Sequence, residues 1–201
     1  MGRLIAPVGS HAVHVCIDMQ NLFAPGSPWA TAWMPRVLPA MEALVVRAPE
    51  RTVFSRFIPP ASAEEAIGVW KIYYQKWECV TRQRLAAGLL DLVPDLGRYA
   101  PPAAIIDRMG YSAFTGGRLQ DYLHRHHTDT LLISGGETDV CVLATVLSAI
   151  DRGYRLIIAE DALCSSSDES HDAMIGLYTK RFDIQIEVAS VDTILGCWDA
   201  E

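Results

Sequence analysis

The sequence of 201 residues predicts an α/β fold, in which a six-stranded, mainly parallel sheet carries helices on both faces. Short apolar runs recur along the chain and alternate with longer segments whose apolar residues follow a helical spacing. Several of the short runs are apolar almost throughout, as expected of strands that are covered on both faces. Half of the residues are hydrophobic, and no internal repeat or linker interrupts the pattern, so residues 1–201 are expected to form a single domain.

The first half of the chain supplies two strands and two helical segments. Residues 12–17 form a nearly continuous apolar run that is followed by Asp18, which predicts a buried strand. Residues 35–48 have a helical stripe of apolar side chains, and residues 52–57 form the second expected strand. A Pro-rich exit leads to residues 64–83, which are expected to be at least partly helical. Four aromatic side chains share one face of that segment: Trp70, Tyr73, Tyr74 and Trp77.

The second half continues the alternation. The remaining strands are expected at residues 103–106, 131–134, 155–159 and 185–189. Two glycine pairs, at 116–117 and 135–136, break regular structure before the helices that end near residues 127 and 150. The Thr138 hydroxyl is expected to cap the second of these helices, and residues 165–168 to cap another that runs to about residue 181. Residues 191–198 are expected to form a short terminal helix or tail.

Composition excludes some classes of partner and suggests a compartment. The formal net charge is −7, which argues against binding to nucleic acid. No apolar run approaches the length of a membrane span, and the first residues do not have the pattern of a signal peptide. The sequence has five cysteines, an odd number without paired spacing. A reducing cytoplasm is therefore the expected location.

Three chemically useful residues follow apolar strands, namely Asp18, Arg108 and Cys141. Because the carboxyl ends of parallel strands meet at one edge of a sheet, we expect them to converge there. A carboxylate, a cation and a thiol make a workable acyl-transfer site. Asp18 would act as general base and acid, Arg108 would stabilise charge, and Cys141 would attack a carbonyl carbon. The alternatives are a turn-capping role for Asp18 and a small buried core cysteine at 141.

Cys141 falls in the first turn of the helix that follows the Gly135-Gly136 pair. The positive end of a helix favours a thiolate, so we expect an ionised, reactive sulfur near neutral pH. The backbone N–H groups of Glu137 and Cys141 are expected to receive the oxyanion.

Several motifs together resemble the isochorismatase-like cysteine hydrolases, a family that includes nicotinamidases and N-carbamoylsarcosine amidase. The resemblance covers nearly the whole chain and rests on IDMQNLF at 17–23, FSRFIPP at 54–60, W-x-x-Y-Y-x-x-W at 70–77, DRMGYSAF at 107–114, GGETDVCV at 135–142 and EDALCSSS at 160–167. It implies a six-stranded parallel sheet, a catalytic Asp, Lys and Cys, and a cis peptide bond between Gly136 and Glu137. It also implies a homodimer or homotetramer. Residues 64–83 are the candidate contact surface, with a lid over the pocket as the alternative.

The sequence departs from that family pattern at two places. Arg108 stands where the family has its lysine; arginine keeps the charge but does not readily carry a proton. Arg56 and Ile58 stand at the positions of the Asp-x-His metal motif of nicotinamidases, and neither suits a metal ion. We therefore expect no metal and no cofactor.

Further residues are candidates for binding the substrate. Arg56 would hold a substrate carboxylate, with a solvated surface arginine as the alternative. Glu137 would orient an amine or urea group, unless its side chain points to solvent. Apolar pocket walls are expected from aromatic residues, for which packing in the core or at an interface is the competing interpretation. The aromatic candidates are Phe23, Trp70, Tyr74, Tyr111 and Phe114. Gln20, two residues after Asp18, is the remaining candidate for binding the substrate.

These observations predict a cofactor-free hydrolase that cleaves a C–N bond of a small amide, carbamoyl or ureido compound through a thioester on Cys141. Two alternatives remain open. In the first, which Arg108 raises, the protein is a catalytically impaired or inactive binding member of the same fold. In the second, it cleaves a vinyl ether by acid catalysis, as an isochorismatase does, without a nucleophilic thiol.

Overall fold

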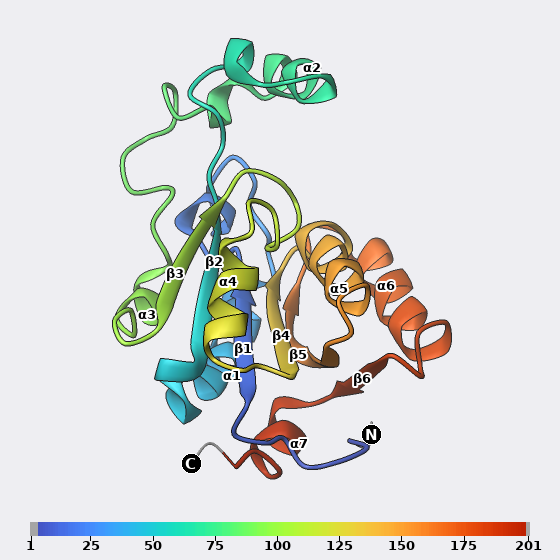
Figure 1. Cartoon of the computed structure of the whole chain (residues 1–201). Coiled ribbons are helices and arrows are strands. Elements are labelled where there is room, and N and C mark those ends of the chain that lie inside the picture. Colours follow the sequence, from blue (N-terminus) through green and yellow to red (C-terminus); the bar gives the residue numbers. More distant parts are fainter. Residues whose placement is uncertain (1–3, 200–201) are drawn as a thin grey trace.

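The computed structural model describes residues 4–199 and contains a six-stranded parallel sheet in the order β3-β2-β1-β4-β5-β6 (Figure 1). The strand order runs outward in both directions from the neighbours β1 and β4. The strands are β1 (Ala12–Ile17), β2 (Thr52–Phe57), β3 (Ala104–Arg108), β4 (Thr130–Gly136), β5 (Arg155–Cys164) and β6 (Ile186–Ala189). The predicted α/β class and the parallel six-stranded sheet are confirmed.

The helices cover both faces of the sheet. They are α1 (Met34–Arg47), α2 (Val69–Lys76), α3 (Pro94–Gly97), α4 (Arg118–Arg125), α5 (Leu143–Ile150), α6 (Asp168–Lys180) and α7 (Val191–Leu195). Side chains of α1 and α7 pack in one hydrophobic core, and those of α4, α5 and α6 pack in the other. All six residues of β1 are buried, because this central strand is covered on both sides.

The glycine pair at 135–136 does not end its strand as expected. The pairing of β4 with β5 shifts register between Ile133 and Gly135 and then resumes, so both glycines remain in β4. Gly135 has a φ of 110°, and a Cβ atom at this position would overlap the backbone of Ile17. The close contact between the ends of β1 and β4 therefore requires glycine at 135.

The chain between β2 and α3 forms an excursion, which we call the arm (residues 58–92). Figure 1 shows it beyond the carboxyl ends of β2 and β3. Its helix, α2, is shorter than the predicted segment 64–83, because Gly68 (φ 54°) and Trp77 (ψ 43°) leave helical geometry on either side. The returning limb is tied to the body where the Asn21 N–H donates to Asp91 O over 2.9 Å and the Leu22 N–H donates to Leu89 O over 2.8 Å.

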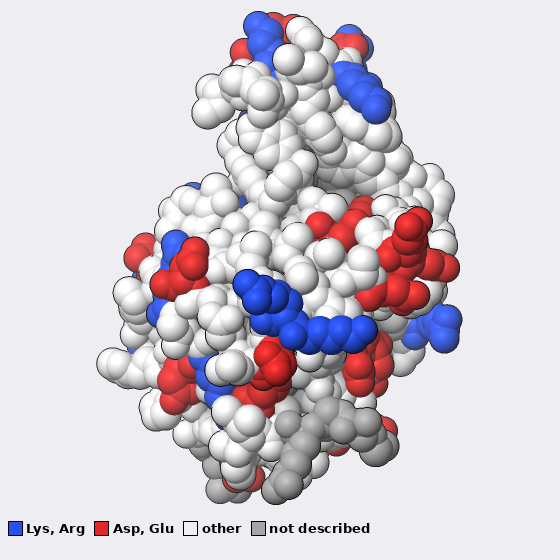
Figure 2. Space-filling model, turned by 90° about the vertical axis from the view of Figure 1, so that its right-hand side faces the viewer, with Lys and Arg blue, Asp and Glu red and all other residues white. Residues whose placement is uncertain are grey.

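The arm also presents apolar side chains to solvent. Ile67, Val69 and Ile72 are exposed, and Figure 2 shows the arm as a lobe that rises above the body. The homodimer or homotetramer that would use this surface stays a prediction. Over residues 4–199, no helix combines the length and apolar character needed to cross a bilayer.

Candidate active site

The sheet brings the three predicted catalytic residues to one edge. Asp18 follows β1, Arg108 ends β3, and Cys141 lies in a π-helical turn (Thr138–Val142) that follows β4. β1 and β4 are neighbours at the point where the strand order reverses direction, which is where ligands bind in open α/β sheets. The peptide bond between Gly136 and Glu137, just before this turn, is cis in the structure.

Asp18 and Arg108 form a buried ion pair. Arg108 Nη2 donates to Asp18 Oδ2 over 2.6 Å, and the two side chains are 0% and 1% exposed. Asp18 has a φ of 54°, in the left-handed region that aspartate tolerates better than most residues. Asp18 Oδ1 and Arg108 Nε and Nη1 are also buried, and they have no hydrogen-bond partner within residues 4–199. The ion pair therefore keeps unused hydrogen-bonding capacity at the site.

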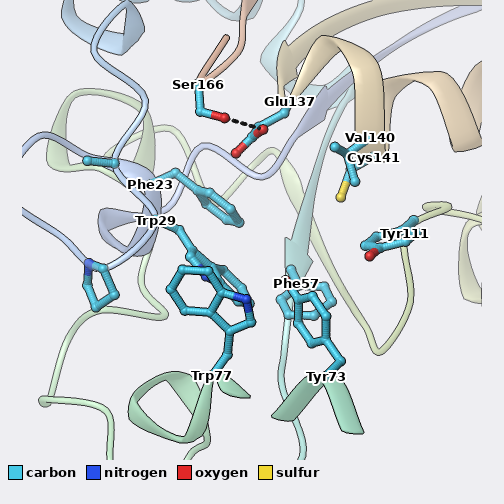
Figure 3. A pocket seen from close by; sticks show the side chains of 12 residues that line it. Phe23, Trp29, Phe57, Tyr73, Trp77, Tyr111, Glu137, Val140, Cys141 and Ser166 are labelled. Carbon is cyan, nitrogen blue, oxygen red and sulfur yellow. Dashed lines mark hydrogen bonds between the residues drawn. The ribbon is translucent and has the colours of Figure 1, made fainter. Parts of the chain in front are cut away.

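The Cys141 thiol lies beside Asp18 and Arg108, close enough for the charges of both to shift its pKa. Cys141 is 7% exposed, and that exposure opens into a cavity (Figure 3). The predicted capping role of Thr138 is wrong. Its hydroxyl instead donates to the backbone oxygen of Cys164 over 3.1 Å and bonds to His171 Nδ1 at 2.9 Å.

The prediction that Cys141 is a thiolate is corrected, because the site is buried. Burial and the adjacent Asp18 charge raise the pKa of Cys141 well above its usual value, although Arg108 opposes this effect. Burial also raises the pKa of Asp18, against the charge of Arg108. Burial alone would lower the pKa of Arg108, but the charge of Asp18 reverses that shift and keeps the guanidinium protonated. In the free protein the Cys141 sulfur is therefore a thiol, and the neighbouring Asp18 carboxylate is a stronger base than usual.

The cavity next to the sulfur has a volume of about 360 Å³ and mainly aromatic walls. Figure 3 shows Phe23, Trp29 and Trp77 on one side, with Phe57, Tyr73 and Tyr111 nearer to Cys141. Trp29 is the central ring, because it packs against Phe23 at a centroid distance of 6.0 Å and against Trp77 at 6.0 Å. The cavity is large enough for a small molecule and is predominantly apolar.

Glu137 is the acidic residue of this cavity lining. Its carboxylate points into the cavity, and Ser166 Oγ donates to Glu137 Oε2 over 2.9 Å (Figure 3). The side chain therefore does not simply point to solvent, which was the alternative from the sequence. Among residues 4–199, the Glu137 N–H has no hydrogen-bond acceptor, so it is free to act on a bound oxygen.

Arg56 lies outside this cavity, and its predicted role toward a substrate carboxylate is corrected. Arg56 Nε donates to Asp107 Oδ1 over 2.7 Å and Nη2 donates to Asp107 Oδ2 over 2.9 Å, because the two residues are register partners on β2 and β3. A guanidinium held in this way is also no ligand for a divalent cation. In the part of the chain that the structure describes, no three His, Cys, Asp or Glu side chains converge to hold a metal ion.

Two other predicted binding residues are structural. Gln20 is fully buried and accepts from the Phe57 N–H over 2.7 Å while its amide donates to Phe57 O and Leu90 O. It joins the end of β2 to the arm instead of facing a ligand. Phe114 is 5% exposed, stacks on Tyr154 and lies under the guanidinium of Arg152, so core packing accounts for it.

The aromatic face of α2 divides between two cavities. Tyr73 and Trp77 line the cavity at Cys141, whereas Trp70 and Tyr74 line a second cavity of about 480 Å³ behind Tyr111 and Phe57. The predicted positions of Phe23, Tyr111 and Glu137 at the first cavity agree with the structure. The binding set from the sequence left out Trp29, Phe57, Tyr73, Trp77 and Ser166. The concentration of aromatic residues in 70–77 and in the loop before α1 was the signal available for most of them.

Fold and site together define an α/β protein with a thiol beside a buried acid–cation pair at the switch point of the sheet. Residues 12–190 match the model of the isochorismatase domain. The chain therefore belongs to the isochorismatase family, as its motifs predict.

Named relatives agree with this assignment. Maleamate amidohydrolase of Pseudomonas putida is 26% identical over 138 residues, which cover 69% of this chain and 59% of the relative. N-carbamoylsarcosine amidase of an Arthrobacter species is 27% identical over 163 residues, or 77% of this chain and 60% of the relative. The chain thus spans about three fifths of the length of these curated relatives. A solved cysteine hydrolase from Pseudomonas syringae pv. phaseolicola has the same fold, with a TM-score of 0.82 at 18% identity over 98% of this chain and 95% of that one.

Proposed function

We propose that this protein is a cysteine-dependent amidohydrolase that cleaves a non-peptide C–N bond of a small molecule. The observation that carries the proposal is the position of the Cys141 thiol, which lies beside the buried Asp18–Arg108 pair at the wall of a cavity of substrate size. The relatives named above as amidohydrolase and amidase support the same reaction class.

The proposed reaction begins with the neutral thiol. As Sγ of Cys141 bonds to the amide carbonyl carbon, the thiol proton passes to Asp18, whose raised pKa makes it a stronger base. The carbonyl oxygen gains negative charge and is held by the N–H groups of Glu137 and Cys141. Arg108 stays charged and limits the electrostatic cost of moving the proton.

The intermediate then loses its nitrogen. The C–N bond breaks as Asp18 returns the proton to the leaving nitrogen, which leaves a thioester on Cys141. Water attacks this thioester while Asp18 takes its proton, and the carboxylic acid is released as the thiol is regenerated.

Selective alkylation tests the accessibility and protonation state of Cys141. We expect iodoacetamide to modify Cys141 before the fully buried Cys16 and Cys164, in a protein whose exposed Cys79 and Cys197 are replaced by serine. Because the pKa of the Cys141 thiol is raised well above its usual value, the rate should keep rising with pH through pH 9 without a plateau near neutrality. Peptide mass spectrometry over time gives both results. Reaction of Cys16 or Cys164 ahead of Cys141 would contradict the proposed nucleophile.

The presence of arginine at position 108 supports a second candidate function, that of a binding protein without catalytic turnover. An arginine carries charge but moves protons poorly, so replacement of the family lysine fits loss of activity as well as a changed reaction. For a hydrolase, we expect the wild type to cleave members of a panel of amides, ureas and carbamoyl compounds. Arg108→Lys should stay within about tenfold of the wild-type kcat/KM, because a cation remains beside Asp18. A wild type that is inert while Arg108→Lys is active would establish the binding protein instead.

A further inference from the structure

The cavity at Cys141 has an unusual balance of charge. Six of its twelve lining residues are aromatic, one is the carboxylate of Glu137, and none is Lys, Arg or His. The two arginines considered from the sequence are occupied, since Arg108 is paired with Asp18 and Arg56 is paired with Asp107. A substrate carboxylate would therefore find no free cation in this lining.

Glu137 has no cationic partner of its own. No Lys or Arg of residues 4–199 lies within ion-pair distance of its carboxylate. Burial raises the pKa of Glu137, and the charges of Asp139 and Asp18 act in the same direction, whereas the hydrogen bonds from Ser166 oppose it. A half-buried carboxylate without a cationic partner is stabilised by a cation that enters the cavity.

The aromatic walls suit a particular kind of cation. The Glu137 carboxylate faces the ring of Phe23, and the rings of Trp29 and Trp77 stand on the same side of the cavity (Figure 3). Faces of aromatic rings attract ammonium groups, and methylated ammonium groups suit an aromatic cavity because they lose less hydration energy when they enter it. On the face shown in Figure 2, acidic side chains gather beside the hollow under the arm, while basic ones lie on the arm and lower on the body.

We propose that the cavity selects amides whose acyl part carries an alkylammonium group. The cation lies between Glu137 and the rings of Phe23, Trp29 and Trp77, while the amide carbonyl faces Cys141. Glu137 is then the specificity-determining residue, and Ser166 holds its carboxylate in place. This inference rests on the proposed amidohydrolase function for the identity of the reacting group, but not for the charge preference.

The test compares two amides of the same shape. Trimethylammonioacetamide and tert-butylacetamide differ by one atom, nitrogen for carbon, which gives the first a positive charge. Binding is measured calorimetrically with Cys141→Ala protein, so that no turnover intervenes. We expect the ammonium compound to bind at least about tenfold more tightly than its neutral counterpart, and the anionic succinamate to bind most weakly. Equal or weaker binding of the ammonium compound overturns the proposal.

A second substitution assigns the preference to Glu137. In Glu137→Gln, the ratio of the two affinities should fall to about threefold or less, because the cation–π contribution alone remains. Glu50→Gln is the matched control: it removes the same charge at the opposite end of the sheet and should leave the ratio unchanged. An unchanged ratio in Glu137→Gln contradicts the assignment.

The result is separable from the fate of the proposed reaction. If the wild type hydrolyses no amide but the affinity ratio holds, the charge preference stands and the hydrolase proposal fails. If the wild type hydrolyses both amides at equal kcat/KM and the affinities are equal, the hydrolase proposal stands and the charge preference fails.

Discussion

Replacement of Cys141 by alanine is expected to lower kcat/KM for amide hydrolysis by about 10³-fold or more, because it removes the proposed nucleophile. The cavity and the Asp18–Arg108 pair remain, so substrate affinity should change little. The loss of one small side chain that is 7% exposed should lower the free energy of unfolding by less than about 1.5 kcal/mol. Steady-state kinetics and a denaturant titration measure the two quantities.

Cys16→Ala is the control for this substitution. Cys16 is a fully buried cysteine of β1 that lies among core side chains and does not line the cavity. Its replacement should destabilise the protein at least as much as that of Cys141 while leaving kcat/KM within about threefold of the wild type. A comparable loss of activity in the two variants would show that Cys141 acts through packing and not as a nucleophile.

Asp18→Asn is expected to damage both activity and stability. It removes the proton acceptor for the thiol, which should lower kcat/KM by about 10²-fold or more. It also leaves the buried Arg108 charge without its carboxylate, which should lower the free energy of unfolding by about 3 kcal/mol. Asparagine is the suitable replacement because it tolerates the left-handed backbone that Asp18 adopts.

Asp107→Asn provides the comparison for the stability loss. Asp107 pairs with Arg56 on neighbouring strands, but its side chain is 37% exposed and that of Arg56 is 20% exposed. Water can replace the lost partner there, so the free energy of unfolding should fall by about 1 kcal/mol or less. Equal losses in Asp18→Asn and Asp107→Asn would mean that burial of the Asp18–Arg108 pair does not set its importance.

The position of the three candidate catalytic residues was predictable because it depends on topology alone. Continuous apolar runs indicate buried strands, and parallel strands deliver Asp18, Arg108 and Cys141 to one edge whatever the detailed packing. The strand bounds for β1 and β2 agree with the prediction at both ends. The extension of β4 through Gly136 could not be foreseen, because the register shift opposite β5 is a property of the pair of strands.

The predictions for Arg56 and for the charge state of Cys141 failed because neither strand register nor depth of burial can be read from the sequence. Arg56 faces Asp107 because β2 and β3 pair in a particular register, which the sequence of either strand does not contain. The thiolate was inferred from the helix end and the flanking acid and guanidinium, whereas burial has the largest effect on the pKa of Cys141 and raises it. Trp29 reaches the cavity through the loop before α1, whose path no periodic pattern describes.

The central claim is that Cys141 carries the acyl group during turnover. The most direct test is rapid acid quenching of wild-type protein during hydrolysis of the best amide of the panel, followed by mass spectrometry of the peptide that contains Cys141. We expect that peptide to gain the mass of the acyl group. Hydroxylamine should remove the adduct, as it does a thioester, and Cys141→Ser protein should form no thioester. Continued turnover in Cys141→Ser, with no adduct on the wild-type peptide at any time, would contradict the claim and favour acid catalysis without a nucleophilic thiol.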